Sequence, residues 1–275
     1  MKGRSLRQSF LGAGSDEALQ HIEVGIVGLG GGGSQIAQQL AHLGVGQFVL
    51  IDPDRIEESN LNRLVGGTFA DASKNEWKVE IARRLIRSVN PDASVTVAKD
   101  RWQQRGDLIK TCDILFGCVD SFAGRDELEK AARRYLTPYI DIGMDVHQEK
   151  DGTYSISGQV ALSMPGEACL HCMNVLRPEL IAQEAAQYGA AGPRPQVVWS
   201  NGVLASVAVG IMVQLVTPWH DHHNSLLLLE YDGNSSEVRV GSAVSFLRGK
   251  VCQHFGDVAS LGDPWFGQMS PPEVV

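Results

Sequence analysis

The residues best suited to chemistry begin with a run of glycines, 28–33, with the sequence Gly-Leu-Gly-Gly-Gly-Gly. The run follows an apolar, β-branched segment (24–27) and precedes a segment with apolar residues at helical spacing (35–43). Between a strand and a helix, glycines permit a tight turn and a close approach of the backbone to a phosphate. The pattern predicts a phosphate-binding turn, although a glycine-rich turn without a ligand would look the same. Its predicted binding residues are Gly28, Gly30, Gly31 and Gly33.

A carboxylate follows at the end of the next predicted strand. Residues 47–51 form an apolar run, and Asp52 comes directly after it. About twenty residues beyond a glycine turn, a carboxylate accepts hydrogen bonds from ribose hydroxyls. Asp52 is therefore predicted to bind the ribose of a nucleotide. Up to this point a nicotinamide dinucleotide fits as well as a mononucleotide.

Further polar residues distinguish these two possibilities. The chain continues with Asp52-Pro53-Asp54, Ser59-Asn60-Leu61-Asn62-Arg63, Lys78 at the start of a predicted helix, and Asp120 followed by Arg125 after a later strand. A glycine turn, a D-x-D strand end, an S-N-L-x-R segment, a lysine and this aspartate occur in the same order in the ThiF/MoeB adenylating enzymes, relatives of the ubiquitin-activating enzymes. The sequence resembles this family over residues 7–231. The joint match is far more specific than the glycine pattern alone.

The resemblance implies activation of a carboxylate by ATP. The carboxylate attacks the α-phosphorus and pyrophosphate leaves, so charge on the phosphoryl oxygens must be met by fixed cations. By resemblance, Arg63 and Lys78 supply these cations and Asp120 holds Mg²⁺, which makes these three the implied catalytic residues. The remaining ATP-binding residues that the resemblance implies are Gly28, Gly30, Gly31, Gly33, Asp52, Asp54 and Asn60.

Each of these charged residues also has an ordinary structural explanation. Lys78 could be a solvated helix charge, and Arg63 could pair with Glu57 or Glu58. Asp120 could cap the following helix. Arg125 fits equally well as the start of a charged helix face.

Two expectations concern the N-terminus and the quaternary structure. Arg7 stands where related enzymes carry an arginine that reaches into the ATP site of a partner subunit, so the resemblance makes it a fourth catalytic candidate. A solvated terminal charge explains Arg7 equally well. The homodimer that this role requires is implied by the resemblance alone.

The cysteines suggest a metal site. Cys169-Leu-His-Cys172 has the spacing of zinc ligands, and it resembles the first half of the family's four-cysteine zinc site. The second half is incomplete, because Cys252 is followed by Gln253 and His254, with Phe255 where a fourth cysteine is expected. Zinc held by Cys169, Cys172, Cys252 and His254 is one interpretation. Buried thiols or a reactive pair are the others.

No cysteine occurs at 178–199, where many relatives carry the residue that captures the activated acyl group. Three alternatives remain: direct transfer to an acceptor, an ester on Ser200, or a role for Cys172. Ser200-Asn201 is more simply explained as a helix N-cap. Cys112 and Cys118 are predicted to be small core residues, and His220, His222 and His223 to form a solvated turn.

The elements that position these residues alternate between strand and helix up to about residue 142. This alternation predicts an α/β fold: a Rossmann-like, mostly parallel sheet with helices on both faces. Beyond residue 142 a hairpin signal at Asp151-Gly152 and alternating segments predict an antiparallel extension in the second half. The segment 203–216, apolar nearly all round, is predicted to be a buried helix.

We expect residues 1–20 to form an N-terminal arm, 21–245 the adenylation domain with a crossover loop at 178–195, and 246–275 a tail. The chain has 275 residues and a net charge of −8 without a basic run, which argues against nucleic-acid binding. No apolar leader or long apolar run indicates secretion or a membrane span. The cytoplasm is therefore the expected compartment.

The function expected from the resemblance is adenylation of the C-terminal glycine of a ubiquitin-like or sulfur-carrier protein, with possible transfer to a conjugating enzyme. An exposed apolar strand face in the second half is expected to dock this partner. Alternatives are adenylation of a peptide or small carboxylic acid, a silent scaffold that binds a ubiquitin-like protein, and a nicotinamide-dependent oxidoreductase. The last would leave Asn60, Arg63, Lys78 and Asp120 without a role.

Overall fold

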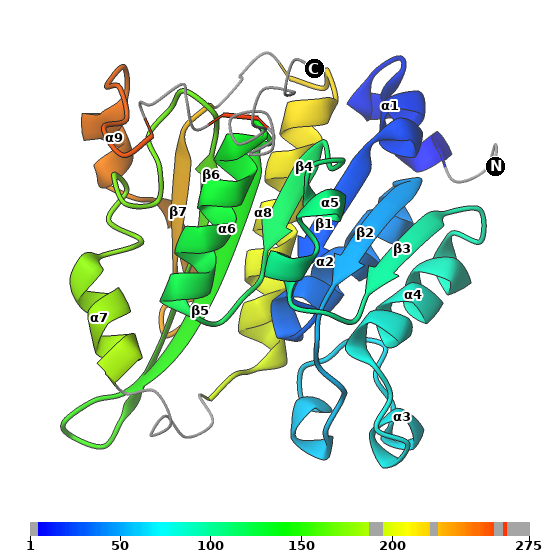
Figure 1. Cartoon of the computed structure of the whole chain (residues 1–275), viewed down its shortest axis with the longest axis horizontal. Coiled ribbons are helices and arrows are strands. Elements are labelled where there is room, and N and C mark those ends of the chain that lie inside the picture. Colours follow the sequence, from blue (N-terminus) through cyan, green and yellow to red (C-terminus); the bar gives the residue numbers. More distant parts are fainter. Residues whose placement is uncertain (1–4, 187–194, 221–224, 256–260, 263–275) are drawn as a thin grey trace, which may run out of the picture.

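A computed structural model describes residues 5–186, 195–220, 225–255 and 261–262, and all structural statements below concern these residues. Its centre is one sheet in the order β3-β2-β1-β4-β5-β6-β7-β8 (Figure 1). The strands are β1 (Glu23–Val27), β2 (Gln47–Ile51), β3 (Ser94–Ala98), β4 (Ile114–Gly117), β5 (Tyr139–Gln148), β6 (Tyr154–Ser163), β7 (Leu227–Asp232) and β8 (Glu237–Val240). The first five are parallel neighbours and the last three add antiparallel pairs. The predicted fold class is confirmed.

Helices cover both faces of the sheet. They are α1 (Ser15–His21), α2 (Gly31–Leu43), α3 (Phe69–Ser73), α4 (Lys78–Val89), α5 (Gly106–Ile109), α6 (Phe122–Arg134), α7 (Pro178–Ala186), α8 (Val198–Val216) and α9 (Ala243–Leu247). Figure 1 shows α8 behind the sheet and α6 in front of it. Alternate strand residues serve the two layers: Phe48 and Leu50 pack in the core with α2, α4 and α8, and Val49 in the core with α6.

The strand order reverses between β1 and β4, with β2 and β3 on one side of β1 and β5 on the other. In such sheets a crevice forms at the carboxyl ends of the strands where the order reverses, because the connections leave in opposite directions. The predicted site residues follow β1, β2 and β4. The fold therefore gathers segments that lie far apart in the sequence at one edge of the sheet.

Helix α8 corresponds to the predicted apolar helix but begins earlier, at Val198. Ser200 and Asn201 therefore lie within its first turn, and the N-cap is Val197, so the N-cap prediction was wrong. By length and composition α8 could cross a membrane. Its contacts with α2, β5 and β6 instead bury half of it, which explains its apolar residues as those of a core helix.

Other expected elements are close to those observed. The hairpin at Asp151-Gly152 joins β5 and β6 as predicted. Helix α2 begins at Gly31, so the glycines themselves form its first turn. Of the predicted crossover loop, α7 and Pro195 are described and residues 187–194 lie outside the described residues. The same holds for most of the predicted tail and for His222 and His223.

Candidate functional site

The glycine turn between β1 and α2 has little room for side chains. Gly28 has a φ of 89°, a left-handed conformation, and a Cβ there would lie 2.4 Å from the Cys118 carbonyl oxygen. A Cβ on Gly33 would lie 1.9 Å from the Gly28 carbonyl oxygen, so Gly33 permits close packing of helix on strand. Gly30, the N-cap of α2, faces open space. The turn thus leaves the N-terminus of α2, with its positive dipole end, open to a ligand.

An open cleft of about 1630 Å³ lies over this turn. Nine of the residues predicted to bind ATP line it: Gly28, Gly30, Gly31, Asp52, Asp54, Asn60, Arg63, Lys78 and Asp120. Gly33 does not line the cleft and has the packing role described above. The fold therefore brings the predicted set together, and the role of each residue stays a prediction.

Asp52 ties the end of β2 to the glycine turn. Its two carboxylate oxygens accept hydrogen bonds from the backbone N–H groups of Leu29 (2.6 Å) and Asp54 (2.8 Å). Burial raises the pKa of the Asp52 carboxyl, an effect opposed by Lys78 and the two N–H groups. Asp52 therefore fixes the shape of the cleft floor in addition to its predicted contact with a ribose.

Lys78 is the first residue of α4, where a cation faces the positive end of the helix dipole. Its backbone N–H donates to the Asp54 carbonyl oxygen, and its Nζ lies 2.8 Å from Asp54 Oδ2. The loop that follows β2 thus aims the ammonium group into the cleft. A lysine at the first position of a helix is unfavourable for that helix, and here the Asp54 carboxylate is placed opposite it. This arrangement favours a functional role for Lys78 over that of a solvated surface charge.

Arg63 follows the single-turn 3₁₀ helix η3 (Glu58–Asn60). One of its terminal nitrogens donates to the Ser59 carbonyl oxygen and to Asn62 Oδ1, both at 2.9 Å. Among the described residues no carboxylate pairs with it, so the suggested ion pair with Glu57 or Glu58 was wrong. Asn60 forms a capping box with Glu57 that holds η3 in place. The guanidinium keeps its charge available to an anion in the cleft.

Asp120 lies between β4 and α6 and is exposed to the cleft. It does not cap α6, since Ser121 is the N-cap and accepts a hydrogen bond from the Gly124 N–H. Gln196, just before α8, donates from Nε2 to Asp120 Oδ1 at 3.3 Å. A carboxylate so placed presents hard oxygen ligands of the kind that Mg²⁺ prefers.

Arg125 does not lie on a charged helix face, so that alternative was wrong. Its guanidinium is buried and makes two hydrogen bonds to the buried carboxylate of Asp141 in β5. The Tyr139 hydroxyl donates to the same carboxylate at 2.9 Å. Although burial opposes the charge, Asp141 raises the pKa of Arg125. The pair fastens α6 to the sheet at the back of the cleft.

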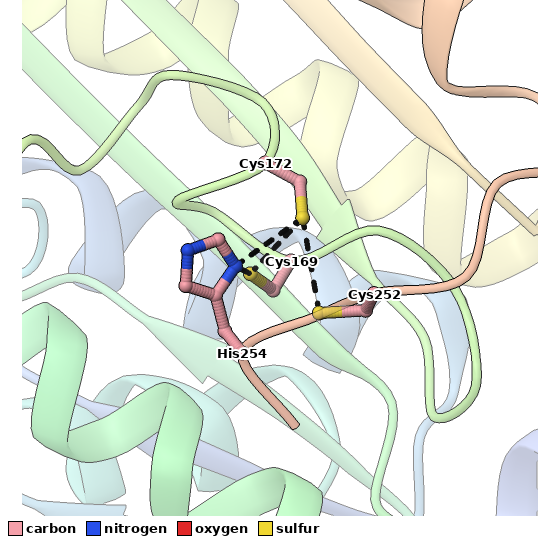
Figure 2. Close-up of side chains that lie close together, drawn as sticks. All are labelled: Cys169, Cys172, Cys252 and His254. Carbon is pink, nitrogen blue, oxygen red and sulfur yellow. Dashed lines mark hydrogen bonds between the residues drawn. The ribbon is translucent and has the colours of Figure 1, made fainter. Parts of the chain in front are cut away.

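The predicted metal ligands converge (Figure 2). The ligand atoms of Cys169, Cys172, Cys252 and His254 all lie within 4.8 Å of one another. Adjacent sulfurs are 3.7 and 3.8 Å apart, and His254 Nδ1 is 3.4 Å from two sulfurs. A zinc ion with about 2.3 Å bonds to sulfur and 2.0 Å bonds to nitrogen gives tetrahedral edges of about 3.8 and 3.5 Å. The set therefore fits zinc, and the single residue between Cys252 and His254 is no obstacle.

Helix α6 supports this cluster from one side. Glu129 accepts a hydrogen bond from the Leu170 N–H inside the Cys-x-x-Cys turn, and Arg133 donates to the carbonyl oxygen of Ala168. Asp126 contacts the ring of His171 at 2.8 Å, and that ring stacks on His254. Such outer contacts orient metal ligands. The cluster and Phe255, which lies against the Arg133 guanidinium, join α6 to the C-terminal segment.

The sequence pattern of the ThiF family matches residues 3–245. The chain belongs to the ThiF family.

Curated relatives of this ThiF-family chain include ubiquitin-like modifier-activating enzyme 5. The Dictyostelium discoideum enzyme is 28% identical over 221 residues, covering 72% of this chain and 52% of that enzyme. The Gallus gallus enzyme is 29% identical over 222 residues, covering 73% and 51%. The chain therefore spans about half the length of the curated relatives it matches.

Solved structures share the fold. E. coli MccB with ATP has a TM-score of 0.69 at 24% identity, covering 86% of this chain and 70% of that chain. MccB with selenomethionine MccA has a TM-score of 0.71 at 23% identity, covering 87% and 71%. At these identities the likeness establishes the ThiF fold alone.

The described cysteines offer no activated nucleophile in the cleft. Burial raises the pKa of Cys112 to about 12 and that of Cys118, at the cleft wall, well above the ordinary value. Both are therefore protonated at neutral pH, and the thiol is a poor nucleophile. Ser200 is fully buried, and its Oγ has no hydrogen-bond partner in the described part of the chain, which argues against an ester on this residue.

The second half of the cleft has a mixed lining. Its strand residues include eight polar ones, Asp145, His147, Ser155, Ser157, Gln159, Glu230, Asp232 and Arg239, beside the apolar Ile142, Met144, Ile156, Leu228 and Tyr231. Exposed apolar residues of these strands are Tyr154, Val238 and Val240, and the expected apolar docking face stays a prediction. Arg7 lies in η1 (Ser5–Arg7) and is exposed.

Sequence reasoning missed three polar residues near the site. Gln196 contacts Asp120, Asn201 packs on the glycine turn, and Asp141 holds Arg125. Asn201 gave a weak signal as a polar residue at the start of an apolar helix. Nothing in the spacing of the other two pointed to their partners.

Proposed function

We propose that this protein uses ATP to adenylate the C-terminal glycine of a ubiquitin-like or sulfur-carrier protein. The observation that carries the proposal is the gathering of Arg63, Lys78 and Asp120 around the open N-terminus of α2 in one cleft. The family relation supports the substrate class, since two relatives are named ubiquitin-like modifier-activating enzymes. A hydride-transfer enzyme would have no use for these three charges.

The geometry suggests how the step proceeds. The glycine turn and the α2 dipole hold the phosphates, and Asp52 holds the ribose. The carrier's carboxylate oxygen attacks the α-phosphorus, the bond to the bridging oxygen breaks, and pyrophosphate leaves. Arg63 and Lys78 stabilise charge on the phosphoryl oxygens. Asp120 would hold Mg²⁺, which neutralises phosphate charge when bound.

The acyl group then passes directly to an external acceptor. No cysteine occurs at 178–199, and Ser200 is buried. Neither this stretch nor Ser200 therefore offers an accessible nucleophile for a covalent intermediate. The acceptor is a conjugating enzyme or a sulfur donor. We place the whole process in the cytoplasm, in keeping with five cysteines that form no disulfide.

Zinc has a structural role in this proposal. Its predicted ligands, Cys169, Cys172, Cys252 and His254, form a closed set of four, which leaves no position for a substrate. Burial raises the pKa of the Cys169 thiol, so a bound metal must displace its proton. The ion would fasten the segment after α9 to the loop before α7.

We further propose a homodimer. A second, apolar groove of about 690 Å³ lies between α2, α8 and the N-terminal segment. Phe10 and Trp219 border it with exposed fractions of 67% and 41%. Exposed apolar patches of this kind mark interaction surfaces. A second copy on this groove would carry the exposed Arg7 into the interface; light scattering of wild type and Phe10→Asp tests this, and a monomeric wild type would reject it.

A peptide or small carboxylic acid is the second candidate substrate. The structural neighbour named as the microcin C7 biosynthetic enzyme MccB was solved in complex with N-formylated MccA. The polar strand residues in the second half of the cleft are compatible with an extended peptide. Short peptides with a free carboxylate therefore belong in any substrate panel.

ATP–pyrophosphate exchange tests the proposal. Purified protein, Mg²⁺, ATP and labelled pyrophosphate are combined with a panel of ubiquitin-like proteins that end in glycine, and with peptides. We expect exchange that depends on one carrier and disappears in Arg63→Ala and Asp120→Ala. Exchange with peptides alone would support the second candidate. Confirmed ATP binding without exchange for any partner would indicate a silent scaffold.

A further inference from the structure

Gln196 joins the two sides of the cleft. Its Nε2 donates to Asp120 Oδ1 at 3.3 Å, and its backbone carbonyl oxygen accepts from Asn62 Nδ2 at 3.1 Å. Asn62 Oδ1 in turn accepts from Arg63 at 2.9 Å. One chain of hydrogen bonds therefore runs from the predicted magnesium ligand, through Gln196 and Asn62, to the predicted catalytic arginine.

The position of Gln196 is itself fixed by the glycine turn. The Asn201 side chain donates to the carbonyl oxygen of Val197, next to Gln196, at 2.9 Å. Asn201 is buried, and a Cβ on Gly31 would lie 2.6 Å from its amide nitrogen. The segment that carries Gln196 is thus locked against the turn predicted to hold the phosphates.

The chain on the other side of residues 187–194 contacts the start of α6. Glu184 of α7 accepts a hydrogen bond from the Ala123 N–H at 3.2 Å, three residues beyond Asp120. The described residues before and after 187–194 therefore contact α6 at Ala123 and the β4–α6 turn at Asp120. Contacts at two points restrict the orientation of the turn that bears Asp120.

We propose that Gln196 is a positioning residue for adenylation, which sets the Asp120 carboxylate and, through Asn62, the Arg63 guanidinium for the same substrate. This inference rests on the proposed function. The amide is suited to this role because it donates to one group and carries no charge. It therefore orients Asp120 without neutralising it, whereas a lysine would form an ion pair that competes with a cation.

Substitution of Gln196 should lower kcat more than it changes KM for ATP. Arg63 and Asp120 act on charge that develops in the transition state, so a loss of alignment lowers kcat more than it weakens ATP binding. A misplacement of about 1 Å at a reacting centre costs about 100-fold in rate. For Gln196→Ala we expect kcat of ATP–pyrophosphate exchange to fall about 10- to 100-fold, with KM for ATP changed less than about 3-fold.

Two further variants separate positioning from simple packing. Gln196→Glu keeps the size of the side chain but cannot donate to Asp120 as a carboxylate, and it adds a like charge. We expect it to lose at least as much kcat as Gln196→Ala. Asn62→Ala should also lower kcat, and the double variant with Gln196→Ala should lose less than the product of the two single effects, because both interrupt one chain.

The experiment measures exchange with ATP, labelled pyrophosphate and the carrier that supports wild-type exchange, beside the melting temperature of each variant. Gln148→Ala, an exposed glutamine at the end of β5 outside the cleft, is the matched control. Wild-type kcat in Gln196→Glu, or fully multiplicative effects of the two alanines, would overturn the inference while leaving the proposed function intact. A wild-type protein without exchange would overturn both.

Discussion

Charged residues play opposite parts in two neighbouring regions of this molecule. In the cleft, Arg63 contacts only neutral oxygens among the described residues. Behind it, on the inner face of α6, Arg125 and Asp141 are buried and fully engaged with each other. The difference teaches that a charge is available for chemistry where the fold supports it without neutralising it. The predictions below test this division, beginning with the largest effect.

Removal of the cleft arginine should abolish chemistry and leave the fold intact. We expect Arg63→Ala to lower ATP–pyrophosphate exchange by about 10³-fold or more, in line with the value of arginines that meet phosphoryl charge. The melting temperature should change by less than about 2 °C, because Arg63 makes no buried ion pair with any residue that the structure describes. Arg83→Ala on α4, whose partner is Glu80, is the matched control. A comparable loss of exchange in Arg63→Ala and Arg83→Ala would contradict a specific role for the cleft arginine.

Removal of the buried Arg125 should lower the stability of the fold, unlike removal of Arg63. Arg125→Ala leaves the Asp141 charge uncompensated, which costs about 3–5 kcal/mol. For a chain of this size the melting temperature should fall by about 10 °C. Calorimetry and urea unfolding measure this effect.

The paired variant Arg125→Met with Asp141→Asn removes both charges. It should be more stable than Arg125→Ala, because no buried charge is left alone and the amide oxygen can still accept from the Tyr139 hydroxyl. An Arg125→Ala protein with wild-type stability would mean that the buried pair does not fasten α6 to the sheet.

Removal of metal should loosen the contact of α6 with the C-terminal segment and spare the cleft. We expect about one zinc ion per chain in the purified protein. Chelation, or Cys172→Ser, should release it and lower the melting temperature by several degrees, since zinc binding contributes to folding. ATP affinity should change less than about 3-fold. Metal analysis and calorimetry check this, with Cys112→Ser as the control cysteine, and metal-free protein of unchanged stability would contradict it.

The smallest effect concerns an exposed partner. Asp54 pairs with Lys78 but is 62% exposed in its side chain. Asp54→Asn should therefore change the free energy of unfolding by less than about 1 kcal/mol. Because Lys78 would no longer be oriented by an ion pair, KM for ATP should rise a few-fold. A large loss of stability would mean that the Asp54–Lys78 pair stabilises the fold as the buried Arg125–Asp141 pair does.

The sequence predicted the fold and the membership of the cleft because both depend on local order: alternating strands and helices, and polar residues directly after strand ends. It could not show that Arg125 is buried while Arg63 faces the cleft, because burial depends on tertiary packing. The role of His254 required the C-terminal segment to meet the loop at 169–172, which no spacing rule predicts. Gln196 acts through a partner 76 positions away in the sequence.

Transfer of oxygen from the carrier to AMP tests the central claim most directly. A carrier whose C-terminal carboxylate is labelled with ¹⁸O is incubated with protein, Mg²⁺ and ATP, and AMP is analysed by mass spectrometry. If the carboxylate attacks the α-phosphorus, one labelled oxygen remains on AMP when the acyl group is transferred or hydrolysed. Label in AMP that is absent with Arg63→Ala is the predicted result. AMP formed without label would contradict carboxylate adenylation by this cleft.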